Sequence, residues 1–202
     1  MYPKIELHLH LDGSLNVDTL FEFALEDNII NKNENINYFK NKIEINKNDK
    51  TLIDYLSKFK IPVQTLQNEE RLYRVGKEII ENLYKQGYLY AEIRFAPEIH
   101  TEKGLKIDQV VNAVQKGLDE SSNELGFNYG LILCCMRHDS IEKANKIIQL
   151  GNYYKENNNT KIVGIDLAGD EFNYPPELFK ECFLSSNLPI TIHAGEARGF
   201  DS

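Results

Sequence analysis

Short apolar runs alternate along the chain with longer segments of helical periodicity. Five runs are strand-like, since each is rich in aliphatic residues and ends in a turn or a polar cluster. They occupy residues 4–11, 88–96, 129–136, 161–168 and 189–194. Between them, apolar residues recur three and four positions apart, which predicts amphipathic helices at 16–27, 69–86, 108–125, 141–156 and 176–185.

This order predicts an α/β fold with parallel strands, because a helix between two strands returns the chain to the same end of the sheet. A doubly wound sheet and a partial barrel both fit five such units. A complete (β/α)8 barrel needs about 250 residues, whereas this chain has 202. The length favours one domain, or a domain and a fraction, over residues 1–202. The Asn- and Lys-rich stretch 31–50 is expected to be an exposed insertion.

The first strand has one apolar and one polar face. Its odd-numbered positions from 5 to 11 are apolar, whereas the other face carries Glu6, His8, His10 and Asp12. Desolvating such a polar row is unfavourable unless each group finds a partner. A divalent cation would satisfy His8 and His10, and paired imidazoles suit Zn²⁺. The alternative is that both histidines form hydrogen bonds at a solvated edge.

A third histidine lies in the last apolar run, PITIHAGE. His193 shares a face with Thr191, and Glu196 follows in the next loop. Parallel barrels keep their chemistry at the carboxyl ends of their strands, which is where His193, Glu196 and the first strand's histidines all fall. His193 alone would indicate a hydrogen-bonded core residue, but the combination favours a metal site.

Composition narrows the class of protein. The formal net charge of −8 argues against a nucleic-acid-binding surface. No apolar run approaches the length of a membrane span, and no signal peptide precedes the first strand. Cys134, Cys135 and Cys182 lack a CxxC spacing and are expected to be reduced thiols. We therefore expect a cytoplasmic protein without nucleic-acid or membrane partners.

Five motifs, in the order PKIELHLHLDGSL, AEIRFAPEIHT, LILCCMRH, IVGIDLAGDE and ITIHAGE, resemble the adenosine deaminase family. The similarity runs from Pro3 to Glu196. It implies a TIM (β/α)8 barrel of which this chain holds about the first five β/α units, the N-terminal part. The implied activity is zinc-dependent hydrolytic deamination of adenosine and 2′-deoxyadenosine to inosine and ammonia, a step of purine salvage.

The resemblance also implies roles for single residues. His8, His10 and His193 match three ligands of one Zn²⁺ ion, which lowers the pKa of water. Glu196 matches the catalytic acid that protonates purine N1. Apart from the resemblance, Asp166 lies near Gly169 in the sequence and is expected to anchor a hydrogen-bond network behind the ligands.

Further matches imply substrate contacts. His10 lies beside the substrate, Asp12 binds a ribose hydroxyl, and Gly169 offers its backbone N–H to purine N3. The segment TLIDYLSKF resembles the family's short helix over the ribose and purine. One helical face of it carries the four apolar residues Leu52, Tyr55, Leu56 and Phe59, for which ordinary core packing is the alternative.

Three other features have structural interpretations. Glu92 and Arg94 share a strand face and are expected to form a buried ion pair. His100 and His138 are expected to be loop or surface residues without a role. AMP is disfavoured as the substrate, because no cationic cluster for a phosphate lies near the motifs.

The resemblance places more catalytic residues after the fifth strand: a histidine on strand six and two aspartates at the end of strand eight. The sequence ends at Ser202, and nothing in it can replace them. Open edges on the first and fifth strands would favour self-association or pairing with a complementary C-terminal chain. The alternatives are a fragment that binds metal or nucleoside without turnover, and a deaminase of adenine or modified adenosine.

Overall fold

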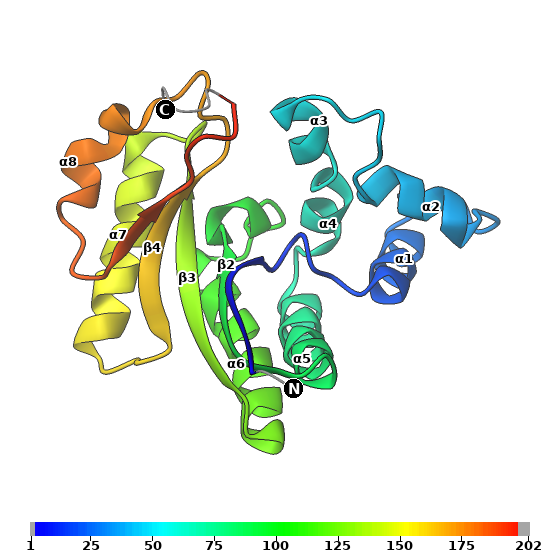
Figure 1. Ribbon diagram of the computed structural model, residues 1–202, viewed down its shortest axis with the longest axis horizontal. Helices are drawn as coiled ribbons and strands as arrows, with labels where there is room; N and C mark the ends of the chain where they lie inside the picture. The colour runs from blue at the N-terminus through cyan, green and yellow to red at the C-terminus, as the bar shows by residue number, and fades with distance from the viewer. Residues whose placement is uncertain (1–2, 198–202) are drawn as a thin grey trace.

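The computed structural model describes residues 3–197 and contains a curved, five-stranded parallel sheet (Figure 1). The strands are β1 (Lys4–His10), β2 (Tyr88–Phe95), β3 (Asn128–Met136), β4 (Ile162–Ala168) and β5 (Ile190–Ile192). Each strand pairs in parallel with the next one along the chain. A doubly wound sheet would reverse its strand order at a switch point, so the sequential order identifies half of a barrel wall.

Three long helices form the crossovers and cover the outer face of this wall. They are α5 (Glu69–Lys85), α6 (Ile107–Leu125) and α7 (Ile141–Glu156), and all three match the predicted segments within two residues (Figure 1). Their apolar stripes form one core with alternate residues of the strands, such as Ile93 and Leu131. The remaining strand residues face the inner side of the barrel, where the polar groups lie.

Helices α5 and α6 pack at very short range. A Cβ atom added at Gly117 would lie 2.0 Å from the carbonyl oxygen of Tyr73. Glycine is therefore required at this position for the two backbones to approach each other.

The connection from β1 to α5 carries four further helices. They are α1 (Val17–Glu26), α2 (Ile36–Ile43), α3 (Leu52–Ser57) and α4 (Lys60–Thr65). The stretch 31–50 is exposed along most of its length, but it forms α2 and buries Phe39 completely against Leu20 and Ala24. This part of the chain lies beside the carboxyl edge of the sheet, where α3 and α4 face the end of β5 across the molecule (Figure 1).

Two short segments complete the described chain. A 3-10 turn, η1 (Pro97–His100), follows β2, and the segment predicted as one helix over 176–185 is instead η2 (Pro176–Phe179) followed by α8 (Lys180–Phe183). Despite this change of helix type, the side chains of Phe179, Cys182 and Phe183 pack in the core. None of the described helices is long and apolar enough to cross a membrane.

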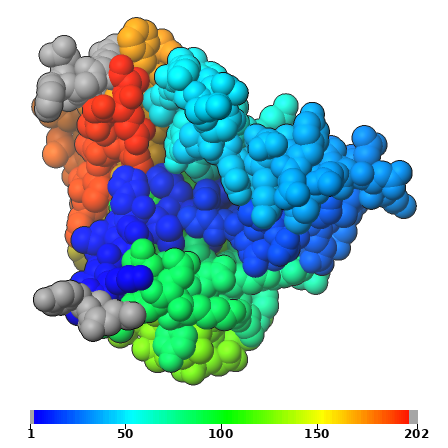
Figure 2. Space-filling model, turned by 45° about the vertical axis from the view of Figure 1, so that its right-hand side comes forward, coloured from blue at the N-terminus to red at the C-terminus, as the bar shows by residue number. Residues whose placement is uncertain are grey.

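Both edge strands expose apolar side chains on the outer face. Ile5 and Leu7 of β1 are 60% and 55% exposed, and Ile190 and Ile192 of β5 are 42% and 45% exposed. The N-terminal strand accordingly lies open on the surface in Figure 2. On the inner strands, the outward-facing residues are mostly covered by helices, as for Ile93 and Leu131, although Leu89 at the start of β2 is exposed.

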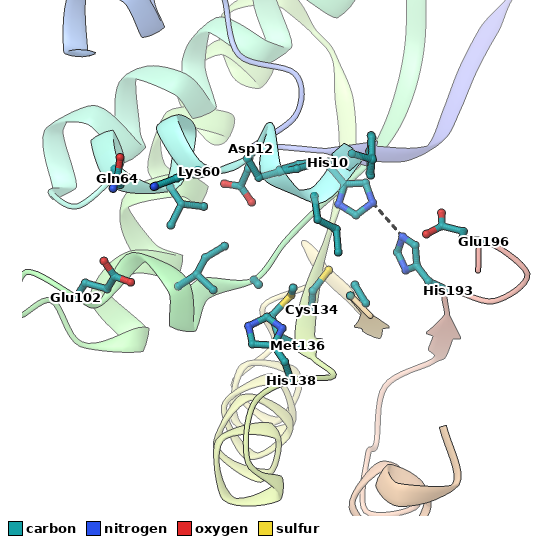
Figure 3. A pocket seen from close by; sticks show the side chains of 18 of the residues that line it. His10, Asp12, Lys60, Gln64, Glu102, Cys134, Met136, His138, His193 and Glu196 are labelled. Carbon is teal, nitrogen blue, oxygen red and sulfur yellow. Dashed lines mark hydrogen bonds between the residues drawn. The ribbon is translucent and has the colours of Figure 1, made fainter. Parts of the chain in front are cut away.

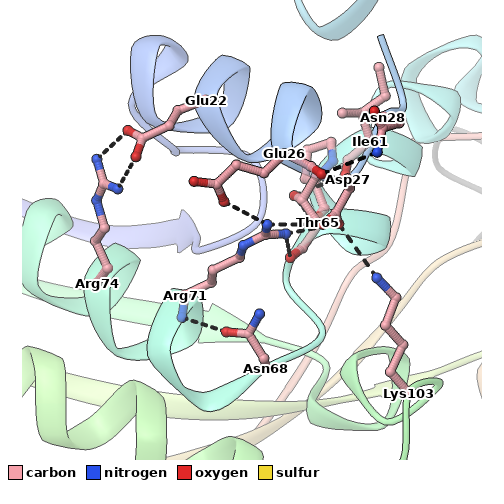
Figure 4. A network of polar contacts seen from close by, with 11 residues as sticks. Glu22, Glu26, Asp27, Asn28, Ile61, Thr65, Asn68, Arg71, Arg74 and Lys103 are labelled. Atoms are coloured by element: carbon pink, nitrogen blue, oxygen red, sulfur yellow. Dashed lines mark hydrogen bonds and ion pairs between the residues drawn. The ribbon is translucent and has the colours of Figure 1, made fainter.

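Arg71 joins three helices beside the sheet (Figure 4). Its guanidinium donates to Glu26, the last residue of α1, and to Asp27, which follows it. It also donates to the carbonyl oxygen of Thr65 at the end of α4. The hydrogen bonds from Arg71 hold the pKa of Asp27 below its usual value. This arrangement fixes α1 and α4 relative to α5.

Substituting Arg71→Met is expected to lower the free energy of unfolding by about 1–3 kcal/mol, because the Thr65 carbonyl loses its bond from Arg71 and Asp27 keeps only the longer contact with Lys103. The pKa of Asp27 is lowered by folding, so this loss is largest above the unfolded pKa and shrinks as the pH falls through the folded one. Urea denaturation at neutral and acidic pH measures both effects.

Lys146→Ala is the matched control, since Lys146 pairs with Glu142 in the exposed i,i+4 geometry of α7. It should change the free energy of unfolding by about 0.5 kcal/mol or less. Equal losses in the two variants would contradict the role given to Arg71.

Candidate metal and nucleoside site

Three histidines from the two edges of the sheet meet at its carboxyl end. His8 and His10 lie on β1, and His193 directly follows β5, 185 residues after His8. Their three Nε2 atoms lie 2.9–3.2 Å from one another. The curvature of the sheet therefore brings together the three residues that the alternating sequence pattern predicted as ligands.

The donor set fits a tetrahedral zinc ion. With Zn–N bonds of about 2.0–2.1 Å, neighbouring nitrogen ligands lie about 3.3–3.4 Å apart, close to the spacing here. Three neutral imidazole nitrogens at such range cannot all donate to one another, whereas one cation can accept all three lone pairs. His8, His10 and His193 are thus the residues that could hold the metal.

Two of these histidines are held in the neutral form that a metal requires. Burial, followed by the neighbouring His193 and His8, lowers the pKa of His10 to about 4. Burial and the nearby Arg94 also lower the pKa of His8. Both side chains consequently carry free lone pairs at neutral pH.

Asp166 contacts Nδ1 of His193, the ring nitrogen that does not face the other two histidines. Its Oδ2 lies 2.8 Å from Nδ1 of His193, and its Oδ1 accepts hydrogen bonds from Thr191 at 2.6 Å and Arg94 at 3.3 Å. The thiol of Cys134 also donates to Oδ2. Burial raises the pKa of Asp166, but the bonds from His193 and Thr191 outweigh it and leave the pKa lowered.

An ionised carboxylate at Nδ1 favours the tautomer of His193 whose Nε2 lone pair faces the ligand cluster. This is the network that Asp166 was predicted to anchor. Burial raises the pKa of Cys134 well above its usual value, and its thiol donates to Asp166. Cys134 does not belong to the cluster of candidate ligands among the described residues.

The predicted ion pair between Glu92 and Arg94 is wrong. Arg94 reaches across the inner face to Asp166, and its Nη2 donates to the carbonyl oxygen of Leu7 at 2.9 Å. Glu92 instead accepts a hydrogen bond from the hydroxyl of Tyr90. Asp166 is fully buried, so it requires the guanidinium more strongly than Glu92 does.

A cavity of about 620 Å³ opens beside the histidine cluster (Figure 3). Most of the predicted site residues line it: His8, His10, Asp12, Tyr55, Leu56, Phe59, Gly169, His193 and Glu196. Leu52 is not among the described lining residues, because it begins α3 one turn away from the wall that Leu56 and Phe59 form. Figure 3 shows Glu196 beside His193, and Asp12, Lys60 and Gln64 on the other side of His10.

One lining residue, Gly169, depends on an unusual backbone conformation. Gly169 has a φ of +105°, a backbone conformation that favours glycine and turns the chain sharply after β4. Met136 and His138 approach the same turn from the end of β3. The glycine thereby presents backbone, without a side chain, to the cavity.

Asp12 is held by a residue that was predicted to have no role. His100 is fully buried, and its Nε2 lies 2.9 Å from Oδ1 of Asp12. The expectation of a loop or surface position is therefore wrong for His100, whereas His138 lines the cavity.

Arg137 is a second residue whose importance the sequence did not reveal. It is fully buried and donates to the carbonyl oxygens of His193 and Tyr174, both at 2.6 Å. It thereby fixes the backbone of a candidate ligand. No pattern in the sequence could identify these partners, because both acceptors are backbone atoms far along the chain.

Comparison with known proteins supports this site. The family model described as adenosine deaminase matches residues 3–202. The adenosine deaminase of Clostridium acetobutylicum is 43% identical over 96% of this chain, and that of Enterococcus faecalis is 38% identical over 96%. The chain spans 58% and 57% of the lengths of these two relatives.

Solved structures show the same fold. Arabidopsis ADAL complexed with IMP superposes with a TM-score of 0.82 at 26% identity, over 98% of this chain and 59% of that chain. Adenine deaminase from Arthrobacter aurescens gives a TM-score of 0.80 at 26% identity, over 96% of this chain and 58% of that chain.

The fold and the histidine cluster together define the N-terminal part of a TIM barrel with a candidate metal centre. Within this class, the chain belongs to the adenosine deaminase family.

Replacing Asp166 by Asn is expected to weaken Zn²⁺ binding about 10- to 100-fold, the usual effect of removing a carboxylate behind a histidine ligand. His193→Ala should weaken it further, because a ligand is lost. Competition titration against a chromophoric chelator measures both affinities.

His138→Ala is the control for this titration, since His138 lines the cavity outside the cluster. It should bind Zn²⁺ as the parent chain does. A parent chain that binds no zinc, or an Asp166→Asn variant with unchanged affinity, would contradict the assignment.

Proposed function

We propose that this chain supplies the larger part of the active site for zinc-dependent hydrolytic deamination of adenosine and 2′-deoxyadenosine to inosine and ammonia. The observation that carries the proposal is the convergence of the three histidines, Glu196 and Asp12 on one cavity. Metal ligands, a proton donor and a partner for a sugar hydroxyl are the groups that this reaction requires.

The chain's own residues bind and orient the nucleoside and move one proton. When bound by His8, His10 and His193, zinc supplies a water molecule of lowered pKa. Glu196 donates a carboxyl proton to purine N1, which relieves negative charge as water adds at C6. The C6–N6 bond then breaks; one proton of the water leaves with N6 as ammonia, and the other returns to Glu196. The wall formed by Tyr55, Leu56 and Phe59 excludes bulk water from the base.

The sugar and the far edge of the purine are bound separately. Asp12 accepts a hydrogen bond from a ribose hydroxyl, and the backbone N–H of Gly169 donates to N3. Both residues line the same cavity.

The charges of the cavity favour a nucleoside over a nucleotide. Lys60 is the only Lys or Arg among the described lining residues, whereas Asp12, Glu102 and Glu196 are acidic. A 5′-phosphate would therefore meet more negative than positive groups. Adenine and AMP remain competing substrates for the test, since one structural relative is an adenine deaminase and another is an N6-mAMP deaminase.

A second candidate function is that of a partial enzyme that becomes active with a complementary C-terminal chain. The exposed apolar side chains on the outer faces of β1 and β5 favour it, because covering helices and strands would bury them. The relatives also extend well beyond the matched region.

The decisive experiment mixes the zinc-loaded chain with a polypeptide that carries the unmatched C-terminal part of the Clostridium acetobutylicum relative. We expect the mixture to deaminate adenosine, and the chain alone to show at most a trace of turnover. The ultraviolet change from adenosine to inosine measures the rate, with adenine and AMP assayed in parallel. Preferential turnover of adenine or AMP would contradict the proposed substrate, and full activity of the chain alone would contradict the need for a partner.

In the active mixture, Glu196→Gln is expected to lower kcat about 10²- to 10⁴-fold, because the amide cannot deliver the proton to N1. Glu102→Gln is the control, since Glu102 lines the same cavity away from the histidines (Figure 3). Equal kcat values for the two variants would show that Glu196 is not the acid.

A further inference from the structure

His100 makes two hydrogen bonds in the core, and one of them reaches the site. Its Nδ1 lies 3.0 Å from the carbonyl oxygen of Leu66, and its Nε2 lies 2.9 Å from Oδ1 of Asp12. His100 and Leu66 are both fully buried, and Asp12 is 5% exposed. All the partners are thus shielded from water that could replace these bonds.

The donors and acceptors fix one of the protons. A carbonyl oxygen can only accept, so Nδ1 of His100 carries a proton and donates it to Leu66. A second proton lies between Nε2 of His100 and Oδ1 of Asp12, and either the imidazole or the carboxyl group carries it. Oδ1 of Asp12 is therefore engaged with His100, whereas Oδ2 has both of its lone pairs for a donor from a ligand in the cavity.

The segment that carries His100 is itself anchored. The side-chain amide of Gln67 donates to the carbonyl oxygens of Ile99 in η1 and Val63 in α4, both at 2.8 Å. Together with the His100–Leu66 bond, this fastens η1 to the end of α4. His100 is consequently a fixed point against which the Asp12 side chain can be aligned.

We propose that His100 is a positioning residue for nucleoside binding: it holds Oδ1 of Asp12 so that Oδ2 meets a ribose hydroxyl. The inference rests on the proposed function, since Asp12 is taken to bind the sugar. Without His100, a buried carboxylate would lose its partner and turn towards water or another donor. The proposal predicts that loss of His100 weakens the binding of ligands that carry a ribose and does not change the affinity for the free base.

Two substitutions separate this role from a purely structural one. The amide nitrogen of His100→Gln can replace Nε2 and donate to Asp12, whereas that of His100→Asn can replace Nδ1 and donate to Leu66. Each variant loses one buried hydrogen bond, so the two should be destabilised to a similar degree in urea. They differ in whether Asp12 keeps a partner.

Gln67→Met provides the matched control at the same junction. It removes the bonds to Ile99 and Val63 and leaves His100 and Asp12 intact. Its nucleoside affinity should fall much less than that of His100→Asn, because the bonds of His100 to Leu66 and to Asp12 both remain.

The binding experiment compares inosine with hypoxanthine, which differ by the ribose, by calorimetry on the zinc-loaded chain. We expect the parent to prefer inosine, His100→Asn to bind inosine about tenfold more weakly with unchanged hypoxanthine affinity, and His100→Gln to retain most of the preference. Equal loss in both variants, an unchanged preference in His100→Asn, or a parent chain that binds both ligands equally would overturn the proposal.

A second readout does not need a ligand. The chain has five histidines, so the ring ¹⁵N signals of His100 can be assigned by single substitutions. Asp12→Asn should shift the Nε2 signal of His100 and leave Nδ1 protonated. If the parent binds neither inosine nor hypoxanthine, the proposed function fails. The spectrum still tests the contact between His100 and Asp12, and an unshifted Nε2 signal would overturn the role of His100.

Discussion

A single buried carboxylate, Asp166, organises the inner face of this half-barrel. It contacts groups from β2, β3 and β5 and from the residue after β5, and none of its atoms is exposed. An unpaired charge in such a position would be strongly unfavourable. The folded state therefore requires Arg94, Thr191 and His193 to contact Asp166 at the same time. The orientation of His193, the third candidate metal ligand, follows from this requirement.

The site also depends on curvature, because its ligands come from opposite edges of the sheet. The interior strands and their covering helices form a continuous core that sets this curvature. Gly117 allows α5 and α6 to approach, and Arg71 fixes the helices beside the cavity. The chemistry at β1 and β5 is therefore determined by packing in the middle of the chain, far from any ligand.

The sequence predicted most of the elements because they follow from local periodicity, whereas His193 became a candidate ligand only through its combination with His8 and His10. The period-two pattern of β1 was sufficient to place His8 and His10 on one face, and the order of strands and helices predicted the parallel sheet. The partners of Arg94 and His100 could not be predicted, since Asp166, Leu66 and Asp12 come close to them only after folding. The same limit applies to Leu52, because helical spacing shows which residues share a face and does not show how far the cavity extends along it.

The central claim is that His8, His10 and His193 form one metal centre. X-ray absorption spectroscopy at the zinc edge of the zinc-loaded chain tests it most directly, because it identifies the atoms bound to the metal. We predict nitrogen ligands at about 2.0–2.1 Å, with the outer-shell scattering of three imidazole rings and no sulfur. Zinc bound by cysteine sulfur, or by fewer than three imidazoles, would contradict the account.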